Sequence, residues 1–508
     1  MDYILKNREL NTSEKILDTV SQQPVDLDFI LPDYCADIEK ILKCSLTPKI
    51  YTRNLSGGQL RVEGASLIRV IYCDSNRGAI RCCEQTLPFS ATFPLNSEAT
   101  DHIILTHTKS EYINCRALTS RRLTIHGAFS LFAKVIAENS CSVCSDSSYD
   151  DLQIKTHSED ICELCEFAQE LVNISEAVSV RTDKNLESIV RSELNALLTD
   201  VSVTGEKITL KGEMTLRLLY ICDVATGETD RFVYVFPFTQ TLSTANPDTT
   251  VRDIRLQVLS YELLLRNELV TEEPVVNLEA KLSVSLMGYK SDRITYIADA
   301  YSTCNCTDLS FANAKIISDI ETLTTSSALK SSLSLGDKNI SRILDIFTEE
   351  CYVNSFIKDS TLHHTGNVNV CILACTDEGE IISLERQVEV HTEESLQKPY
   401  TDVTDSSCMV TSVSFRLSDD NSMELRLDVR FSTIVCNLCS FRQVTQVLYD
   451  DKEPVGKNCP LTLYYAHKGE CVWDIAKRYH AHMDTLCSEN SVSEETLSDD
   501  RMLLVIRG

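Results

Sequence analysis

One unit is repeated three times along this chain, and the repetition limits the possible folds more than any other sequence feature. Each copy opens with a short stretch whose apolar residues fall at positions i, i+3 and i+4: residues 38–42, 186–190 and 340–344. A glycine follows 26 residues after the start of each stretch: Gly64, Gly212 and Gly366. The repeat distance is therefore 148 residues, then 154. Because this spacing places side chains on one face of a helix, we expect a short helix to open each unit.

Around each glycine the apolar residues alternate, which predicts a long, half-buried strand. In the first copy the alternation runs from Leu60 to Tyr72, and the other copies repeat it over 208–220 and 362–372. A glycine inside such a strand indicates a bulge or a bend. A turn follows in each copy, at 74–78, 223–227 and 377–379, and its composition predicts a hairpin.

A second strand-rich block closes each unit, so we expect one short helix and six to eight strands per unit. The predicted fold class is α+β, mostly β, with three repeated antiparallel units followed by a small β-α-α-β domain. The expected divisions are 1–175, 176–325 and 326–450 for the units, 451–459 for a linker and 460–508 for the last domain.

The C-terminal segment has its own pattern. Residues 461–465 predict a strand, a first helix follows the turn at 467–470, a second short helix ends near Asn490, and 502–506 predict a final strand. Apolar residues at helical spacing mark the face that should be buried. The residues expected in this core are Trp473, Ala476, Tyr479 and Leu486.

This segment resembles a LysM domain. The resemblance rests on the pattern Tyr465-x3-Gly469-Glu470-x2-Trp473-Asp474-Ile475-Ala476-x2-Tyr479, followed by Leu486-x3-Asn490. The single tryptophan of the chain falls at the family's tryptophan position. The sequence departs from the family at Glu470-Cys471, where Asp-Thr is usual, and at 499–501, where Pro-Gly usually precedes the last strand.

The three repeated units, each with a long strand around a central glycine and an Asp-to-Gly turn, are similar to SPOCS domains (DUF3794). Several SPOCS units followed by one LysM domain resemble the SipL-like spore coat proteins of Clostridia. The resemblance implies a non-enzymatic scaffold or adaptor of spore coat assembly. Such a protein would bind the spore morphogenetic ATPase SpoIVA and other coat proteins, and help to localise the ATPase around the forespore. It would act in the mother-cell cytoplasm, at the forespore surface and in the spore coat.

LysM modules generally bind N-acetylglucosamine glycans in a groove between the first turn and the loop after the second helix. Here a protein partner is favoured, because the start of the chain shows no secretory signal and the turn threonine is replaced by Cys471. We expect Lys468, Glu470 and Asn490 to form the exposed rim that contacts the partner. The alternative is a LysM-mediated peptidoglycan-binding protein or an accessory subunit of a cell-wall hydrolase.

Composition and motifs argue against other functional classes. A formal charge of −27 disfavours a nucleic-acid partner, and no apolar run is long enough for a transmembrane segment. The motifs of nucleotide-binding loops, zinc proteases, α/β-hydrolases and dinucleotide-binding folds do not occur, so we expect neither catalysis nor a cofactor. His363 and His364 are neighbours on a predicted strand and would point to opposite faces, which makes a shared metal unfavourable.

The chain has 22 cysteines, which we expect to be thiols in a reducing compartment. Two pairs have zinc-like spacing: Cys141-x2-Cys144 and Cys162-x2-Cys165. Because the segment lacks the glycine-bearing turns usual in zinc ribbons, we prefer to interpret these residues as ordinary strand cysteines. A zinc-dependent module built on the four remains a further hypothesis.

Overall fold

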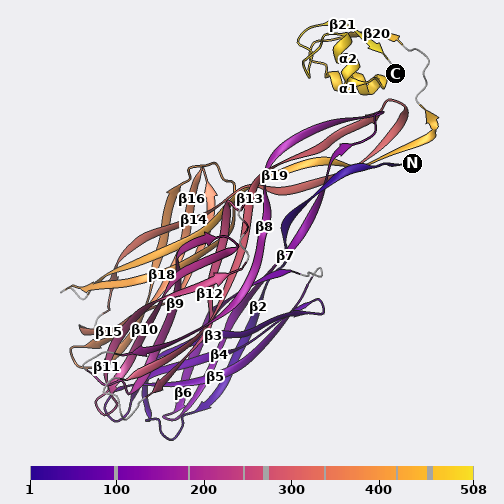
Figure 1. Ribbon diagram of the computed structural model, residues 1–508. Helices are drawn as coiled ribbons and strands as arrows, with labels where there is room; N and C mark the ends of the chain where they lie inside the picture. Colours follow the sequence, from indigo (N-terminus) through magenta and orange to yellow (C-terminus); the bar gives the residue numbers. More distant parts are fainter. Residues whose placement is uncertain are drawn as a thin grey trace.

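The chain folds into three similar β-units and a small C-terminal module, as the computed structural model shows (Figure 1). The structure describes residues 2–95, 101–180, 184–243, 246, 248–266, 274–336, 339–418, 422–454 and 461–506. Its paired strands are antiparallel, and its two short helices lie near the C-terminus. The predicted mostly-β fold is confirmed.

Outside the C-terminal module, the described strands fall into three sets of six, and one short strand, β1 (Asp2–Tyr3), pairs with β19. Unit 1 contains β2 (Leu5–Ile30), β3 (Ile38–Ser56), β4 (Gln59–Asp74), β5 (Ile80–Pro94), β6 (His102–Thr119) and β7 (Arg122–Ser147). Unit 2 contains β8 (Leu152–Ser179), β9 (Ser188–Thr204), β10 (Lys207–Asp223), β11 (Glu228–Leu242), β12 (Val251–Arg266) and β13 (Val275–Ser302). Unit 3 contains β14 (Asn305–Ser334), β15 (Ile340–Lys358), β16 (Thr361–Thr376), β17 (Ile381–Ser395), β18 (Asp402–Leu417) and β19 (Ser422–Pro454).

Each unit is a sandwich of two three-stranded sheets, and in unit 3 the short β1 adds a fourth strand to one of them. In unit 1, β3, β4 and β5 form one sheet in chain order, while β7 lies between β2 and β6 in the other. Units 2 and 3 repeat both arrangements, so the first strand of a unit always pairs with its last. The apolar faces of the two sheets meet in one core per unit, where the alternating residues of the central strand are buried.

The predicted repeat distances are confirmed. The central strands β4, β10 and β16 begin at Gln59, Lys207 and Thr361, which are 148 and then 154 residues apart. The turn after each central strand contains a glycine with positive φ: Gly78 at 66°, Gly227 at 72° and Gly379 at 82°. Glycine adopts this left-handed conformation without the steric cost of a side chain.

The unit divisions shift from the expected positions, because the boundaries at 175/176 and 325/326 fall inside β8 and β14. Both strands pair along their length with the last strand of the same unit. We therefore propose units of residues 5–147, 152–302 and 305–454. Residues 451–454 of the expected linker continue β19, and 455–459 lie outside the described residues.

The predicted helix at the start of each unit is wrong. The stretches 38–42 and 340–344 lie in β3 and β15, and 188–190 open β9. A bulge follows Ile38 and another follows Ile340, and each extra residue returns the side chain three positions later to the same face. The residue at i+4 is apolar for a different reason, because it faces the neighbouring units. Two buried faces and a bulge thus produce a spacing that mimics a helix.

The central glycines are required by close approach of the adjacent strand. A Cβ atom at Gly366 would lie 1.9 Å from the backbone oxygen of Tyr352, and one at Gly64 would lie 2.1 Å from that of Lys49. In both units a bulge lies nearby, but in the adjacent strand rather than in the strand of the glycine, where the sequence predicted a bulge or a bend. Glycine therefore lets the bulged strand pass close to the central one.

The three units pack around a shared core. Leu42, Val190 and Leu344 occupy the same repeat position, one in each unit, and belong to one buried cluster. Ile71, Leu219 and Leu373 do the same from the central strands. Because equivalent residues converge, the single chain has the arrangement of a trimer whose subunits are covalently joined.

Buried charges distinguish one contact between units from another. The repeat position next to the shared core holds Lys43, Arg191 and Asp345 in units 1, 2 and 3. The Lys43 ammonium lies 2.8 Å from Glu349 and 2.6 Å from Glu385 of unit 3. Burial lowers the pKa of Lys43, but these two carboxylates outweigh it and raise the pKa overall. Since a buried charge without its partner is costly, these ion pairs favour the contact between units 1 and 3.

The paired first and last strands extend beyond the sandwiches and form a narrow bundle, which leads from the three units toward the C-terminal module (Figure 1). We call this bundle the stalk; it contains residues 2–11, 140–162, 292–317 and 438–454. Residues of all three units also form its interior, where Leu10, Ile294 and Phe441 belong to one cluster. The rings of Tyr296 and Phe441 stack there at 4.2 Å.

Candidate functional site: the C-terminal module on the stalk

The C-terminal module has the predicted β-α-α-β order. It contains β20 (Leu461–Ala466), α1 (Val472–Tyr479), α2 (Met483–Glu489) and β21 (Arg501–Ile506), and the two strands pair antiparallel. Helix α1 is capped at its C-terminal end by His480, whose φ of 53° is left-handed and whose N–H bonds back to the last turn. A chain of this size has little apolar surface to bury, so every core contact matters to its stability.

The residues expected in the module core lie as follows. Trp473, Ala476 and Leu486 are buried in one cluster, and Tyr479 is half-buried at its edge. That cluster also contains Tyr301, which belongs to β13 at the end of the stalk. The module core is therefore completed by a residue of unit 2.

Trp473 lies at the junction between module and stalk. Its ring meets that of Tyr301 edge-on, with centroids 5.0 Å apart. Its indole Nε1–H donates a hydrogen bond of 2.8 Å to the carboxylate of Asp299, also on β13. Burial raises the pKa of the Tyr301 hydroxyl, which donates a 2.7 Å bond to the backbone oxygen of Ala481. Trp473, which the helical spacing predicted to be a core residue, thus also contacts the stalk.

Asp299 accepts from two side chains of α1. Besides the indole of Trp473, the Lys477 ammonium lies 2.6 and 2.8 Å from its two oxygens. Hydrogen bonds to an ionised group are stronger than those between neutral groups. Nearby, the His480 ring bonds through Nδ1 to the backbone oxygen of Ser302 at 2.7 Å. We refer to Asp299, Tyr301 and Ser302 with their α1-side partners as the seat of the module.

The strand β8 contributes a second contact. The side-chain oxygen of Gln153 accepts from the backbone N–H of Met483 at 3.1 Å, and its nitrogen lies 3.1 Å from the ring of His482. Lys155 pairs with Glu495 in the loop before β21. That hydrogen bond lowers the pKa of Glu495 and raises that of Lys155. Both helices and the following loop are therefore held by the stalk.

The three residues expected at the binding rim differ in their surroundings. Lys468 is exposed, and its backbone N–H bonds to Asp500 at 2.7 Å. The carboxylate of Glu470 accepts bonds from the Tyr464 hydroxyl at 3.0 and 3.2 Å. Asn490 donates to the backbone oxygens of Leu486 and Leu504, both at 2.8 Å, and so joins α2 to β21. Glu470 and Asn490 thus stabilise the module, and Lys468 presents its charge outward.

The two loops that would border a LysM groove are bonded to each other. The N–H of Gly469 donates to Leu497, the N–H of Leu497 to Glu470, and the N–H of Val472 to Glu495, at 2.9, 3.0 and 3.0 Å. These backbone groups are therefore already paired within the module. A sugar ligand would have to rely on other groups.

The outer face of the β20–β21 sheet carries a strip of exposed apolar side chains. Leu461, Leu463, Tyr465 and Met502 are 55%, 64%, 53% and 60% exposed. Contiguous apolar surface of this kind is typical of protein-binding sites. We call these four residues the apolar strip. These four residues were not predicted as a binding surface, although the alternation of large apolar residues from 461 to 465 was a usable signal.

The sequence comparison identifies a known domain within unit 1. The family described as "SipL, SPOCS domain" matches residues 37–118, which run from the start of β3 nearly to the end of β6. The chain carries a SipL SPOCS domain. This domain occurs in spore coat proteins, which form a structural family, and the chain therefore contains a spore coat domain.

The SPOCS match lies within one of three structurally equivalent units, over β3 to β6. The strands of units 2 and 3 follow the same order and the same sheet pairing as those of the matched unit. No curated protein and no solved structure matches the chain. The resemblance of the C-terminal module to LysM stays a prediction. Within the described part of the chain, no helix has the length and apolar character needed to cross a membrane.

The four cysteines of the zinc hypothesis lie at separate levels of the stalk and body. Cys144 and Cys162 are in different buried clusters, and Cys141 packs against a third. The Cys165 thiol lies 3.1 Å from the hydroxyl of Thr249. Burial raises the pKa of all four thiols. In the described ranges no three metal-ligating side chains converge, so these pairs do not form the tetrahedral set of the zinc hypothesis.

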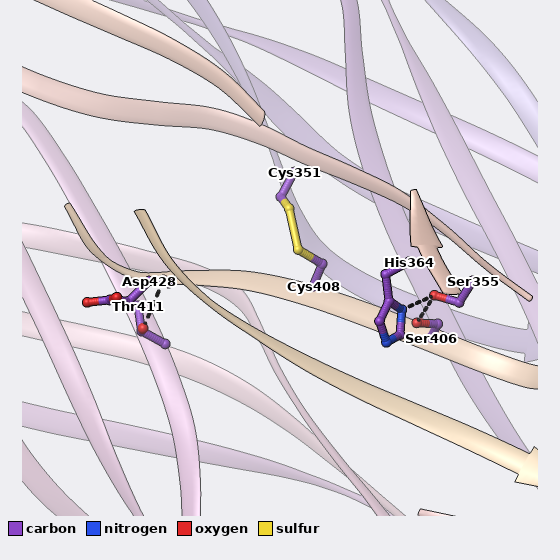
Figure 2. The surroundings of a disulfide bond; sticks show 7 residues. All are labelled: Cys351, Ser355, His364, Ser406, Cys408, Thr411 and Asp428. Carbon is purple, nitrogen blue, oxygen red and sulfur yellow. Dashed lines mark hydrogen bonds between the residues drawn. A yellow bond between two sulfur atoms is a disulfide. The ribbon is translucent and has the colours of Figure 1, made fainter. Parts of the chain in front are cut away.

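One pair of cysteines departs from the expectation that all are thiols. Cys351 of β15 and Cys408 of β18 form a disulfide across unit 3 (Figure 2). Close by, His364 is buried against Phe431, and its Nδ1 lies 2.7 Å from the hydroxyl of Ser355. His363 points to the other face, where it lies 3.4 Å from Glu393. The two histidines are therefore separated by the strand, as the sequence predicts.

Proposed function

We propose that this protein is a non-enzymatic scaffold or adaptor of spore coat assembly. The SPOCS match in unit 1 carries the proposal, and the equivalent folds of units 2 and 3 extend it over most of the chain. The three units form one body through their shared core, and the stalk holds the C-terminal module away from that body. This arrangement suits a protein that joins two partners at a fixed distance.

The C-terminal module is proposed to bind the morphogenetic ATPase SpoIVA and so to help localise it around the forespore, at the mother-cell side. Three observations support a protein partner over a glycan. The apolar strip is exposed, the groove loops are bonded to each other, and the Trp473 face is covered by the stalk. The partner would therefore contact the strip, with Lys468 adding a charge at its border. Other coat proteins would bind the body.

Binding of the purified full chain to the purified ATPase tests the proposal. Leu463→Asp places a charge in the centre of the apolar strip and should weaken the complex at least about tenfold. Leu264→Asp is the matched control, because Leu264 is 58% exposed on β12, outside the module. It should bind like the wild type. Circular dichroism checks that both variants are folded.

Sedimentation with purified murein tests the alternative in parallel. Peptidoglycan binding by the wild type, with no binding of the ATPase, would replace the scaffold proposal by a LysM-mediated wall-binding function. Equal ATPase affinity of Leu463→Asp and the wild type would show that the strip is not the contact surface.

A further inference from the structure

The two sheets of each unit are joined along one edge, and each unit uses a different pair of residues there. The strands at this edge are β3 and β6 in unit 1, β9 and β12 in unit 2, and β15 and β18 in unit 3. In unit 3 the tie is the disulfide of Cys351 and Cys408 (Figure 2). In unit 2 the Tyr261 hydroxyl donates a 2.9 Å bond to the backbone oxygen of Ser192.

In unit 1 the same edge holds two thiols. Cys44 lies on β3 and Cys115 on β6, both pack against the core of unit 1, and each thiol shifts the pKa of the other. Cys44 occupies the repeat position of Ser192, which follows 148 residues later. This equivalence places Cys44 on β3, at the edge of the β3–β4–β5 sheet that lies next to β6 of the other sheet.

Both thiols point between the sheets. Cys44 lies opposite Val70 and Cys115 opposite Ile125, and these two partners are fully buried in the unit core. Residues directly opposite on paired strands share a face of the sheet. Both cysteines are reduced and only half-buried, so a small oxidant can reach them from the edge.

We propose that Cys44 and Cys115 are a redox site that closes into a second intersheet disulfide by exchange with a low-molecular-weight disulfide. The Cys115 thiolate attacks one sulfur of the reagent, forms a mixed disulfide and releases one thiolate. Cys44, deprotonated, then attacks the Cys115 sulfur and displaces the second thiolate. Two protein thiols are oxidised, one disulfide is reduced to two small thiols, and the protons leave with these products.

The roles of the two cysteines follow from their contact. The adjacent Cys44 thiol stabilises the Cys115 thiolate and lowers the pKa of Cys115. The same contact, together with burial, raises the pKa of Cys44. The thiolate is the attacking form, so Cys115 acts first and Cys44 resolves the intermediate.

The neighbouring Cys83 is a poor disulfide partner for Cys44. It lies on β5, with β4 between it and Cys44, and both pair with Val70. Two strand spacings separate their backbones by about 10 Å. A disulfide requires Cα atoms within about 7 Å, so Cys44 and Cys83 cannot be bridged without moving the sheet.

Peptide mapping of the full chain tests this site. The protein is reduced, freed of reductant, incubated with oxidised glutathione, alkylated and digested without further reduction. We expect a peptide linked through Cys44 and Cys115 in the wild type and in the Cys83→Ser control. In Cys44→Ser, which introduces the residue found at position 192, Cys115 should instead retain glutathione.

The oxidised wild type should also resist proteolysis at the β3 and β6 edge more than the reduced protein, because the link restrains both sheets. Two results would overturn the proposal. One is that Cys44 and Cys115 both remain fully alkylated in the wild type while the protein is folded. The other is that Cys115 links to several cysteines without preference for Cys44.

Discussion

Asp299→Ala should release the C-terminal module from the stalk. The substitution removes one hydrogen bond from Trp473 and two from Lys477. Bonds to a charged group contribute about 1.5–3 kcal/mol when buried, but the Asp299 and Lys477 side chains are 25% and 37% exposed. We therefore expect a total loss of about 3 kcal/mol, which would lower the docking equilibrium about 150-fold.

The chain has one tryptophan, so its fluorescence reports on the seat alone. In the wild type, Trp473 is 5% exposed, and its emission should be blue-shifted and poorly quenched by acrylamide. In Asp299→Ala the emission should shift to the red and quenching should rise. Asp308→Ala, which removes an exposed carboxylate elsewhere on the stalk, is the control. Unchanged emission and quenching in Asp299→Ala would refute the role given to this carboxylate.

Further predictions concern the module core, a central glycine and a buried histidine. Trp473→Ala should cost about 3–5 kcal/mol through the cavity it leaves, and the module should become protease-sensitive; a resistant module would contradict its place in the core. Gly366→Ala would set a Cβ against the backbone of Tyr352 and should cost about 2 kcal/mol, measured as a lower thermal midpoint of full-chain unfolding; an unchanged midpoint would count against the close approach. Burial lowers the pKa of His364, and the nearby His363 lowers it further. The buried Nε2 of His364 has no hydrogen-bond partner among the described residues. The unfolded state therefore binds the proton more tightly, so the stability of unit 3 should fall as pH drops below about 6.5, and His364→Val, which matches Val62 of unit 1, should abolish that dependence.

The features predictable from sequence were those set by local pattern. The alternation from Leu60 to Tyr72 needs only one buried sheet face, and the turn at 74–78 needs only a glycine with positive φ. Both recur at the repeat distance, which made the fold of one unit evidence for the others. The β-α-α-β order of the module was equally local.

Contacts between distant segments could not be read in the same way. The stretch 38–42 looked helical because Ile38 and Ile41 face the core of unit 1, whereas Leu42 faces the other two units. The first strand of each unit pairs with its last, so the division at 175/176 could not be seen from composition. The sequence shows nothing that links Trp473 to Asp299, which lies 174 residues away. The bonds of Asn490 to α2 and β21 exist only after folding, so its part in holding the module together could not be read from the sequence.

We propose that this chain joins a SPOCS body to a coat protein through its C-terminal module. Affinity purification of the tagged full chain from sporulating cells tests this proposal. The coat ATPase should be recovered with the wild type and lost with Leu463→Asp, while Leu264→Asp behaves as the wild type. Recovery of murein or a wall hydrolase in place of the ATPase would show that the module binds the cell wall instead.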